Sequence, residues 1–140
     1  MAISSGIAIK FKEDCLEGVH HFTSATFKIA LYTSIASLSN GTSVFLVSGE
    51  LASGNGYTSG GQICTVTDVT IDGSVAIVDF ADQSWTSATF TARGCLIYNS
   101  SQSNKTVAVI DFGGEKTATN GTFTVQMPAA AAATAIVRLA

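Results

Sequence analysis

The chain has 140 residues, of which 46% are hydrophobic and only 12% are charged, and its formal net charge is −3. This length suits one domain with a sizeable core, and the negative charge argues against nucleic acid as a partner, because phosphate binding needs a basic surface. No apolar run reaches the ~18 residues of a membrane span, so we expect no membrane partner.

The low charged fraction is about half that of an average soluble domain. Obligate interfaces are depleted of charge, so this composition favours a chain that hides part of its surface in a permanent assembly. The first ten residues lack a basic stretch before their apolar residues, so we expect no secretory signal. Cys15, Cys64 and Cys95 are widely spaced without a CxxC motif, and we expect buried free thiols.

An amphipathic helix is predicted over residues 9–22. Phe11, Cys15, Val19 and Phe22 recur at helical spacing, with Leu16 beside them. Gly18 weakens the last turn. We treat residues 1–140 as a single domain in which residues 1–22 form an N-terminal segment and helix.

From Thr26 onward the sequence is typical of β-structure, with short apolar runs separated by Gly, Asn, Ser and Asp. Asp72-Gly73 and Asn120-Gly121 are the strongest hairpin signals, because both residues of a type I′ turn need a positive φ. After Pro128, the alanine run is expected to be a tight connection that returns the last strand to a sheet. The expected strands are 27–33, 43–47, 62–69, 75–80, 94–99, 106–112, 122–127 and 135–139, with a weaker one near Trp85.

Two short sequence motifs each occur twice in the chain. TSATF lies at 23–27 and 86–90, and the pattern V-A-[IV]-[VI]-D-F lies within 74–81 and 106–113. The two offsets differ, so a repeat solenoid is disfavoured. We predict an all-β fold, a two-layer, jelly-roll-like β-sandwich with one short N-terminal helix. The side chains expected in or near its core are Phe80, Trp85, Phe90, Tyr98, Phe112 and Phe123.

No motif indicates catalysis. Asp111-Phe112-Gly113 spells the metal-binding tripeptide of kinases, but the rest of a kinase is missing. Four acids could supply the carboxylate pair of a glycosidase, yet no His, Tyr or Lys accompanies them: Asp79, Asp82, Asp111 and Glu115. We expect Arg93 to form an ion pair with an acid such as Asp79 or Asp82, and the pair His20-His21 to end the helix. We therefore predict no enzymatic activity, no metal and no cofactor.

Four segments of the chain resemble those of small virion proteins of tailed bacteriophages, and the resemblance extends over roughly residues 10–140. The segments are TSATFKIALYTS, GNGYTSGG, VDFADQSWTSATFTARGCLIYNS and VAVIDFGGEKTATNGTFTVQMP. The resemblance is greatest to capsid decoration, or cement, proteins. It implies a β-sandwich that binds the major capsid protein on the head surface after assembly in the host cytoplasm. It implies no catalytic residue. The alternatives are a tail, neck or fibre component and a small carbohydrate-binding sandwich.

We also expect a homo-oligomer, with a dimer slightly favoured over a trimer. Candidate contact segments are residues 1–12, the Gly-rich loop 48–61 and the polar loop 99–105, because loops can reach a partner while strands are committed to the core. Within them the candidate interface residues are Ile3, Ile7, Ile9, Asn55, Tyr57 and Gln102.

Overall fold

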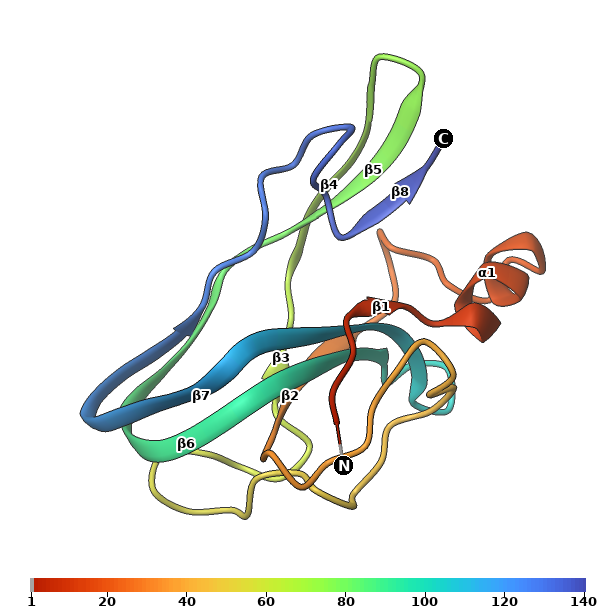
Figure 1. Cartoon of the computed structure of the whole chain (residues 1–140). Helices are drawn as coiled ribbons and strands as arrows, with labels where there is room; N and C mark the ends of the chain where they lie inside the picture. The colour runs from red at the N-terminus through yellow and green to blue at the C-terminus, as the bar shows by residue number, and fades with distance from the viewer. Residues whose placement is uncertain (1) are drawn as a thin grey trace.

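The computed structural model describes residues 2–140, whose strands form two antiparallel sheets that do not close into a barrel (Figure 1). The larger sheet has the strand order β1-β7-β6-β2-β3, and the smaller one has the order β4-β5-β8. The elements are β1 (Gly6–Ile7), α1 (Ile9–Leu16), β2 (Phe27–Tyr32), β3 (Gln62–Ile63), β4 (Val66–Asp72), β5 (Val75–Phe80), β6 (Gln83–Asn99), β7 (Lys105–Val125) and β8 (Val137–Leu139).

One long hairpin dominates the larger sheet. β6 and β7 pair from Gln83↔Val125 to Asn99↔Lys105, with several register shifts along the way. The predicted breaks at Gly94, Gly113 and Asn120 are wrong, because the strands run through all three. β-Bulges absorb the irregular residues: Gly113 has φ 79 and Asn120 has φ 47. Asn120-Gly121 therefore bends a strand and does not reverse the chain.

β2 is buried on both faces, which explains its continuous apolar run. Phe27, Ile29 and Leu31 belong to the main core cluster. Ala30 and Tyr32 belong to a second cluster on the opposite face, together with Ile3 and other side chains. The N-terminal segment therefore completes the cover of this sheet.

The strand expected over 62–69 is divided between the two sheets. β3 pairs with β2, whereas β4 pairs with β5. Between them the Cys64 amide donates a hydrogen bond to the carbonyl of Phe27 (2.8 Å). The hairpin at Asp72-Gly73 is confirmed, although Asp72 pairs with Val75, so that Gly73 and Ser74 form the two-residue turn.

Residues 43–47 do not form the predicted strand. They meet the start of β7 through a bridge between Val44 and Lys105 and through two hydrogen bonds, from the Phe45 amide to the Asn104 carbonyl (2.9 Å) and from the Thr106 amide to the Ser43 carbonyl (3.0 Å). The next positions on the same edge of β7 are occupied by β1, at Ala108 and Val109. The segment therefore has too little free edge to extend.

The helix is shorter than predicted and uses a different face. α1 ends at Leu16, and Gly18 follows with φ 73, a conformation that ends helices and suits glycine. Phe11 is buried as expected, but Leu16 is 91% exposed and Asp14 is only 1% exposed. Because the helix has barely two turns, it buries Phe11 and Asp14 and leaves Leu16 in solvent.

The alanine run covers part of the smaller sheet. The Ala132 amide donates to the carboxylate of Asp72 (2.7 Å). After this turn β8 returns and pairs with β5 from Ala76↔Leu139 to Val78↔Val137. The expected tight connection is therefore confirmed, and it leads to a strand that begins at Val137.

The expected core residues lie mostly inside. Phe80, Trp85, Phe90, Tyr98 and Phe123 are buried, and Phe112 packs partly buried against the main cluster. Trp85 lies between Tyr57 and Phe123, with ring centroids 6.3 Å from each. Val78, Phe80 and Val137 join the same cluster from the smaller sheet, so both sheets contribute to one core.

A test of the packing concerns Gly61, where β3 approaches β2. Gly61 has φ 78, and a Cβ there would overlap the carbonyl of Ile29, whereas Gly73 has φ 63 and open space around it. Gly73→Ala should cost about 1 kcal/mol of stability, from its positive φ alone. Gly61→Ala should cost at least ~3 kcal/mol, because backbone must also move. Urea denaturation of both variants measures the difference, and equal losses would contradict the close approach.

Candidate functional site

The four acids singled out above do not converge on one site. Asp111 forms an ion pair with Arg93, whose Nε lies 2.9 Å from Asp111 Oδ1. Asp82 accepts a hydrogen bond from the Met127 amide (2.6 Å). Asp79 is half-buried on β5 and Glu115 is exposed on β7. The expected ion pair of Arg93 with an acid is confirmed, but the acid is Asp111 and not Asp79 or Asp82, because the shifted register of β6 and β7 brings Asp111 beside Arg93.

Asp111 stabilises a bulge. Besides Arg93, it accepts a hydrogen bond from the Gly113 amide (3.0 Å), which closes the turn-like kink of the strand. Arg93 holds the pKa of the Asp111 carboxyl below its ordinary value. The tripeptide Asp111-Phe112-Gly113 thus has a structural explanation. Within residues 2–140 no three His, Cys, Asp or Glu side chains gather as metal ligands would.

The three cysteines are free thiols, as expected. Cys64 and Cys95 are buried, and Cys15 is partly exposed. Burial raises the pKa of the Cys64 thiol to about 12, and it raises the pKa of Cys95 as well. Nucleophilic cysteines need a lowered pKa, so these two thiols are poor nucleophiles at neutral pH.

A buried polar cluster joins α1 to the ends of β6 and β7. Asp14 Oδ2 lies 3.7 Å from His20 Nε2, and Asp14 Oδ1 lies 3.2 Å from Lys10 Nζ and 3.7 Å from Lys105 Nζ. The side-chain amide of Asn99 donates to His20 Nδ1 (3.1 Å), which leaves the imidazole proton on Nε2, facing Asp14. The two lysines compensate the buried carboxylate, because an unpaired buried charge is costly.

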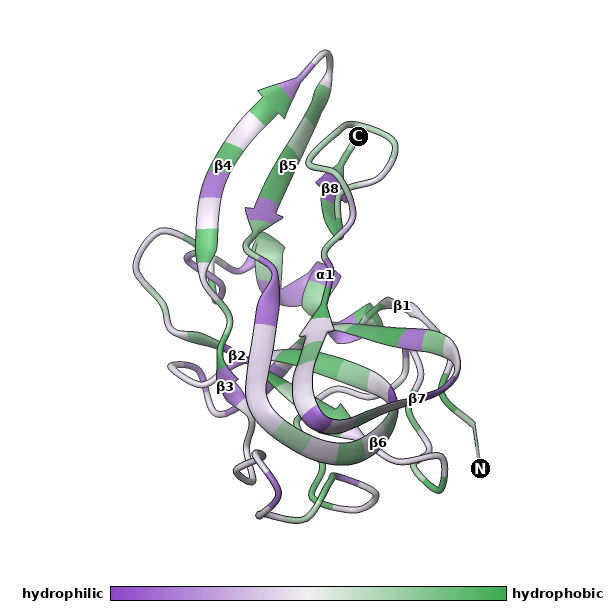
Figure 2. Ribbon diagram, turned by 90° about the vertical axis from the view of Figure 1, so that its left-hand side faces the viewer, coloured by the Kyte–Doolittle hydropathy of each residue, from purple (hydrophilic) through white to green (hydrophobic). Residues whose placement is uncertain are grey.

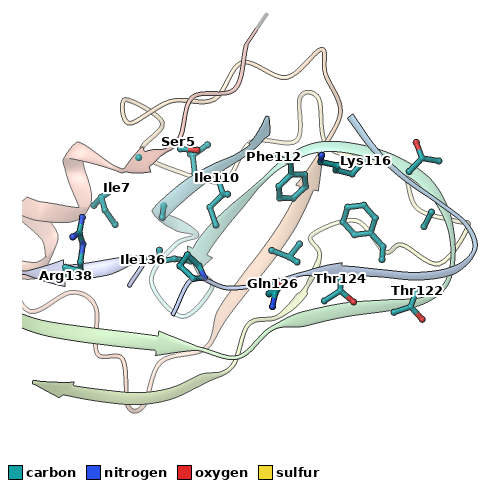
Figure 3. A pocket seen from close by; sticks show the side chains of 18 residues that line it. Ser5, Ile7, Ile110, Phe112, Lys116, Thr122, Thr124, Gln126, Ile136 and Arg138 are labelled. Atoms are coloured by element: carbon teal, nitrogen blue, oxygen red, sulfur yellow. The ribbon is translucent and has the colours of Figure 1, made fainter. Parts of the chain in front are cut away.

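A pocket of about 750 Å³ lies in the bend of β7 (Figure 3). Apolar side chains line it from three segments. Ile110 and Phe112 point into it from β7, Ile7 from β1 and Ile136 from the C-terminal segment. Its lining includes the cations Lys116 and Arg138, and no acid.

Most of the exposed large apolar side chains belong to two regions of the chain. The first, which we call the loop patch, consists of Ile35, Val44, Leu46 and Val47 in the loop after β2. The second, the hairpin patch, consists of Val69, Ile71 and Leu139 on the smaller sheet. The hairpin of β4 and β5 lies at the top of Figures 1 and 2, and the loop lies in their lower part.

The predicted interface residues divide into two groups. Ile3 and Tyr57 are buried within the chain, so they present little surface to a partner. Ile3 packs over Gly94, and Tyr57 donates a hydrogen bond to Glu50 (2.7 Å). Ile7 is half-buried beside the pocket, and the exposed residues are Ile9, Asn55 and Gln102.

The N-terminal segment is part of the fold. The Ser4 amide donates to the carbonyl of Leu38 (2.9 Å), the Ala8 amide donates to Val107 (3.0 Å), and β1 pairs with β7. Loss of residues 2–8 would uncover the second core cluster. Residues 4–8 are therefore held within the fold, while Ile9 remains exposed.

The sequence does not indicate either patch. It predicts a strand over Ser43–Val47, and Val69 and Ile71 belong to a true strand, so a cover is expected over both. The available signal was the clustering of Val44, Leu46 and Val47. It could not indicate exposure, because an apolar run reads the same whether or not another element packs on it.

The buried cluster gives a pH test. Burial lowers the pKa of His20 below its ordinary 6.5, while Asp14 opposes and Lys105 reinforces this change. As the pH falls below 6.5, the unfolded imidazole binds a proton before the folded one, so stability decreases. His20→Gln should therefore flatten the dependence of the unfolding free energy on pH between 7.5 and 5.

The matched control is His21→Gln, since His21 is exposed. This variant should keep the slope of the unmodified chain in chemical denaturation at each pH. If His20→Gln kept that slope too, His20 would not be the group that links stability to pH.

No helix among residues 2–140 has the length and apolar character needed to cross a membrane. Comparison of the chain with models of protein families, with curated proteins and with solved structures finds no match.

Proposed function

We propose that this chain is a bacteriophage virion structural protein that decorates and stabilises the head shell by binding the major capsid protein. The observation that carries the proposal is the loop patch. Ile35 and Val47 are 69% and 76% exposed, and Val44 and Leu46 lie in the same loop. Large apolar side chains grouped on a surface mark sites of protein association.

The composition supports the same conclusion. Only 12% of the residues are charged, and some of these charges are paired with each other, such as Arg93 with Asp111 and Lys10 with Asp14. The chain is therefore suited to a surface that is largely covered in its working state.

The assignment of a particular type of β fold is part of the same proposal. We infer a two-layer β-sandwich of the jelly-roll type, in which Val78, Phe80 and Val137 of the smaller sheet share a core with Phe27 and the larger sheet. The outer end of the β4–β5 hairpin extends past the larger sheet (Figure 1). A decoration protein of this kind would have its place on the head surface of the virion and would assemble in the host cytoplasm.

The alternatives differ in their partner. A tail, neck or fibre component would use the same patches on another virion protein. A carbohydrate-binding sandwich would place aromatic rings at its surface, but Trp85, Tyr32, Tyr57 and Tyr98 are all buried. We therefore retain the tail, neck or fibre role as the second candidate.

A capsid-binding measurement tests the proposal. Purified chain is added to capsids that lack it, and the occupancy and heat stability of the shells are measured. Val47→Asp should weaken binding at least ~10-fold, because a charge in an apolar contact is left without a partner. Leu16→Asp is the matched control, since Leu16 is 91% exposed on α1 and outside both patches, and it should bind normally.

Two results would overturn parts of the proposal. If Val47→Asp bound capsids as well as the unmodified chain, the loop patch would not face the shell. If the unmodified chain bound isolated tails and not capsids, the tail, neck or fibre role would replace head decoration.

A further inference from the structure

The segment that carries the loop patch is anchored on its inner side by an aromatic ring. Phe45 lies between the exposed Val44 and Leu46, and successive side chains of an extended segment point to opposite faces. The Phe45 ring packs on Tyr98 and Tyr32 of the second core cluster, with ring centroids 4.8 Å and 6.5 Å away. The inward position of Phe45 therefore turns Val44 and Leu46 outward.

The backbone of the loop is bonded to the sheet at two places. The Phe45 amide donates to the carbonyl of Asn104 (2.9 Å). Near the other end of the loop, the amide and the hydroxyl of Thr33 both donate to the carbonyl of Gly49 (2.8 Å and 3.0 Å). The loop is therefore attached beside the start of β7 and again beside the end of β2.

A close backbone contact adds Ile35 to the same unit. Ala36 is buried, and a Cβ at Gly49 would lie only 2.6 Å from the Cα of Ala36. Gly49 has φ 83, a conformation that favours glycine. The turn that carries Ile35 thus rests directly on the end of the loop that carries Val47, and these are the two most exposed side chains of the patch.

One buried hydroxyl group fixes the middle of the loop. Tyr32 is 0% exposed, and its phenol donates to the carbonyl of Leu46 (2.5 Å). A buried hydroxyl needs a hydrogen-bond partner, so a movement of Leu46 away from the sheet would leave the phenol without its acceptor. Because Tyr32 has no exposed surface, it cannot contact a protein partner itself. It acts through the position of Leu46.

Position is important for this patch because the loop has no charge. Residues 33–49 contain no Asp, Glu, Lys, Arg or His. No ion pair from this loop can therefore attract or anchor a partner. The affinity of the patch then depends on how its aliphatic side chains fit an uncharged apolar surface, and a loop that is ordered beforehand loses less entropy on binding.

We propose that Tyr32 is the positioning residue of the loop patch. Its phenol holds the Leu46 carbonyl, so that Leu46 and Val47 form a preformed surface for the apolar face of a partner protein. This inference rests on the proposed function, since it concerns the same patch and the same contact with the shell.

Tyr98 provides a matched control. It is also buried in the second core cluster, and its phenol also donates to a loop carbonyl, that of Gly60 (2.6 Å). Gly60 belongs to the Gly-rich loop and not to the loop patch. Tyr32→Phe and Tyr98→Phe therefore each remove one phenol hydroxyl and one bond to a loop, but only the first removes a bond to the patch.

The binding experiment compares these two variants on capsids that lack the chain. Each variant should lower the melting temperature by about 3–5 °C, because each loses one hydrogen bond. Well below the melting range, Tyr32→Phe should weaken binding about 3- to 10-fold, while Tyr98→Phe should bind like the unmodified chain. Phe45→Leu, which loses the ring contact with Tyr98, is a second positioning variant and should weaken binding as well. Circular dichroism establishes that every variant is folded.

Hydrogen exchange of the free chain tests the inference without any capsid. The Phe45 amide reports on the patch, because its bond to Asn104 breaks when the segment leaves the sheet. Tyr32→Phe should speed exchange at Phe45 about 5-fold, and Tyr98→Phe should leave it unchanged. The Gly61 amide, which donates to Thr58 (2.9 Å), should show the reverse response.

Three results would overturn the inference. The first is normal capsid binding by Tyr32→Phe. The second is equal weakening by Tyr32→Phe and Tyr98→Phe, which would reflect lost stability and not lost position. The third is unchanged exchange at Phe45 in Tyr32→Phe. If the unmodified chain did not bind capsids at all, the proposed function would fail, and the exchange measurement alone would decide whether Tyr32 fixes the loop.

Discussion

The pairing of β6 with β7 is the constraint on which the rest of the structure depends. β2 attaches to the free side of β6, β1 attaches to β7, and β3 attaches through β2. Gly94 lies near the middle of β6, where a Cβ would meet the carbonyl of Ile110 and the side chain of Ile3. The absence of a side chain there lets the N-terminal segment lie directly on the sheet, so the hairpin also organises the second core cluster.

The bulges in this hairpin explain both the structural role of Asp111 and the origin of the pocket. A regular strand of the length of β7 would be nearly straight, but register shifts and residues at positive φ bend it. The bend places Ile110 and Phe112 opposite Phe123 and Val125 around one hollow. Arg93 and Asp111 are brought together at the same irregularity. The ion pair between Arg93 and Asp111 therefore stabilises the bulge in β7.

The distribution of apolar surface connects this fold to the proposed role. The core clusters bury the aromatic side chains of both sheets, yet the loop patch and the hairpin patch remain uncovered in the isolated chain. Two apolar regions suit a protein with two kinds of neighbour. We propose that the loop patch contacts the head shell.

The sequence by itself determined the β-rich class, the position of β2 and β5 and the hairpin at Asp72-Gly73, because local periodicity and turn chemistry control these features. Only the tertiary structure decided that Gly113 and Asn120 lie inside one strand, that Asp14 is buried, and that Ile3 and Tyr57 are interior. It also decided that Val47 and Ile71 are exposed. The physical reason is that the burial of a residue depends on which distant segment packs against it, and the local sequence of an apolar run does not specify that segment.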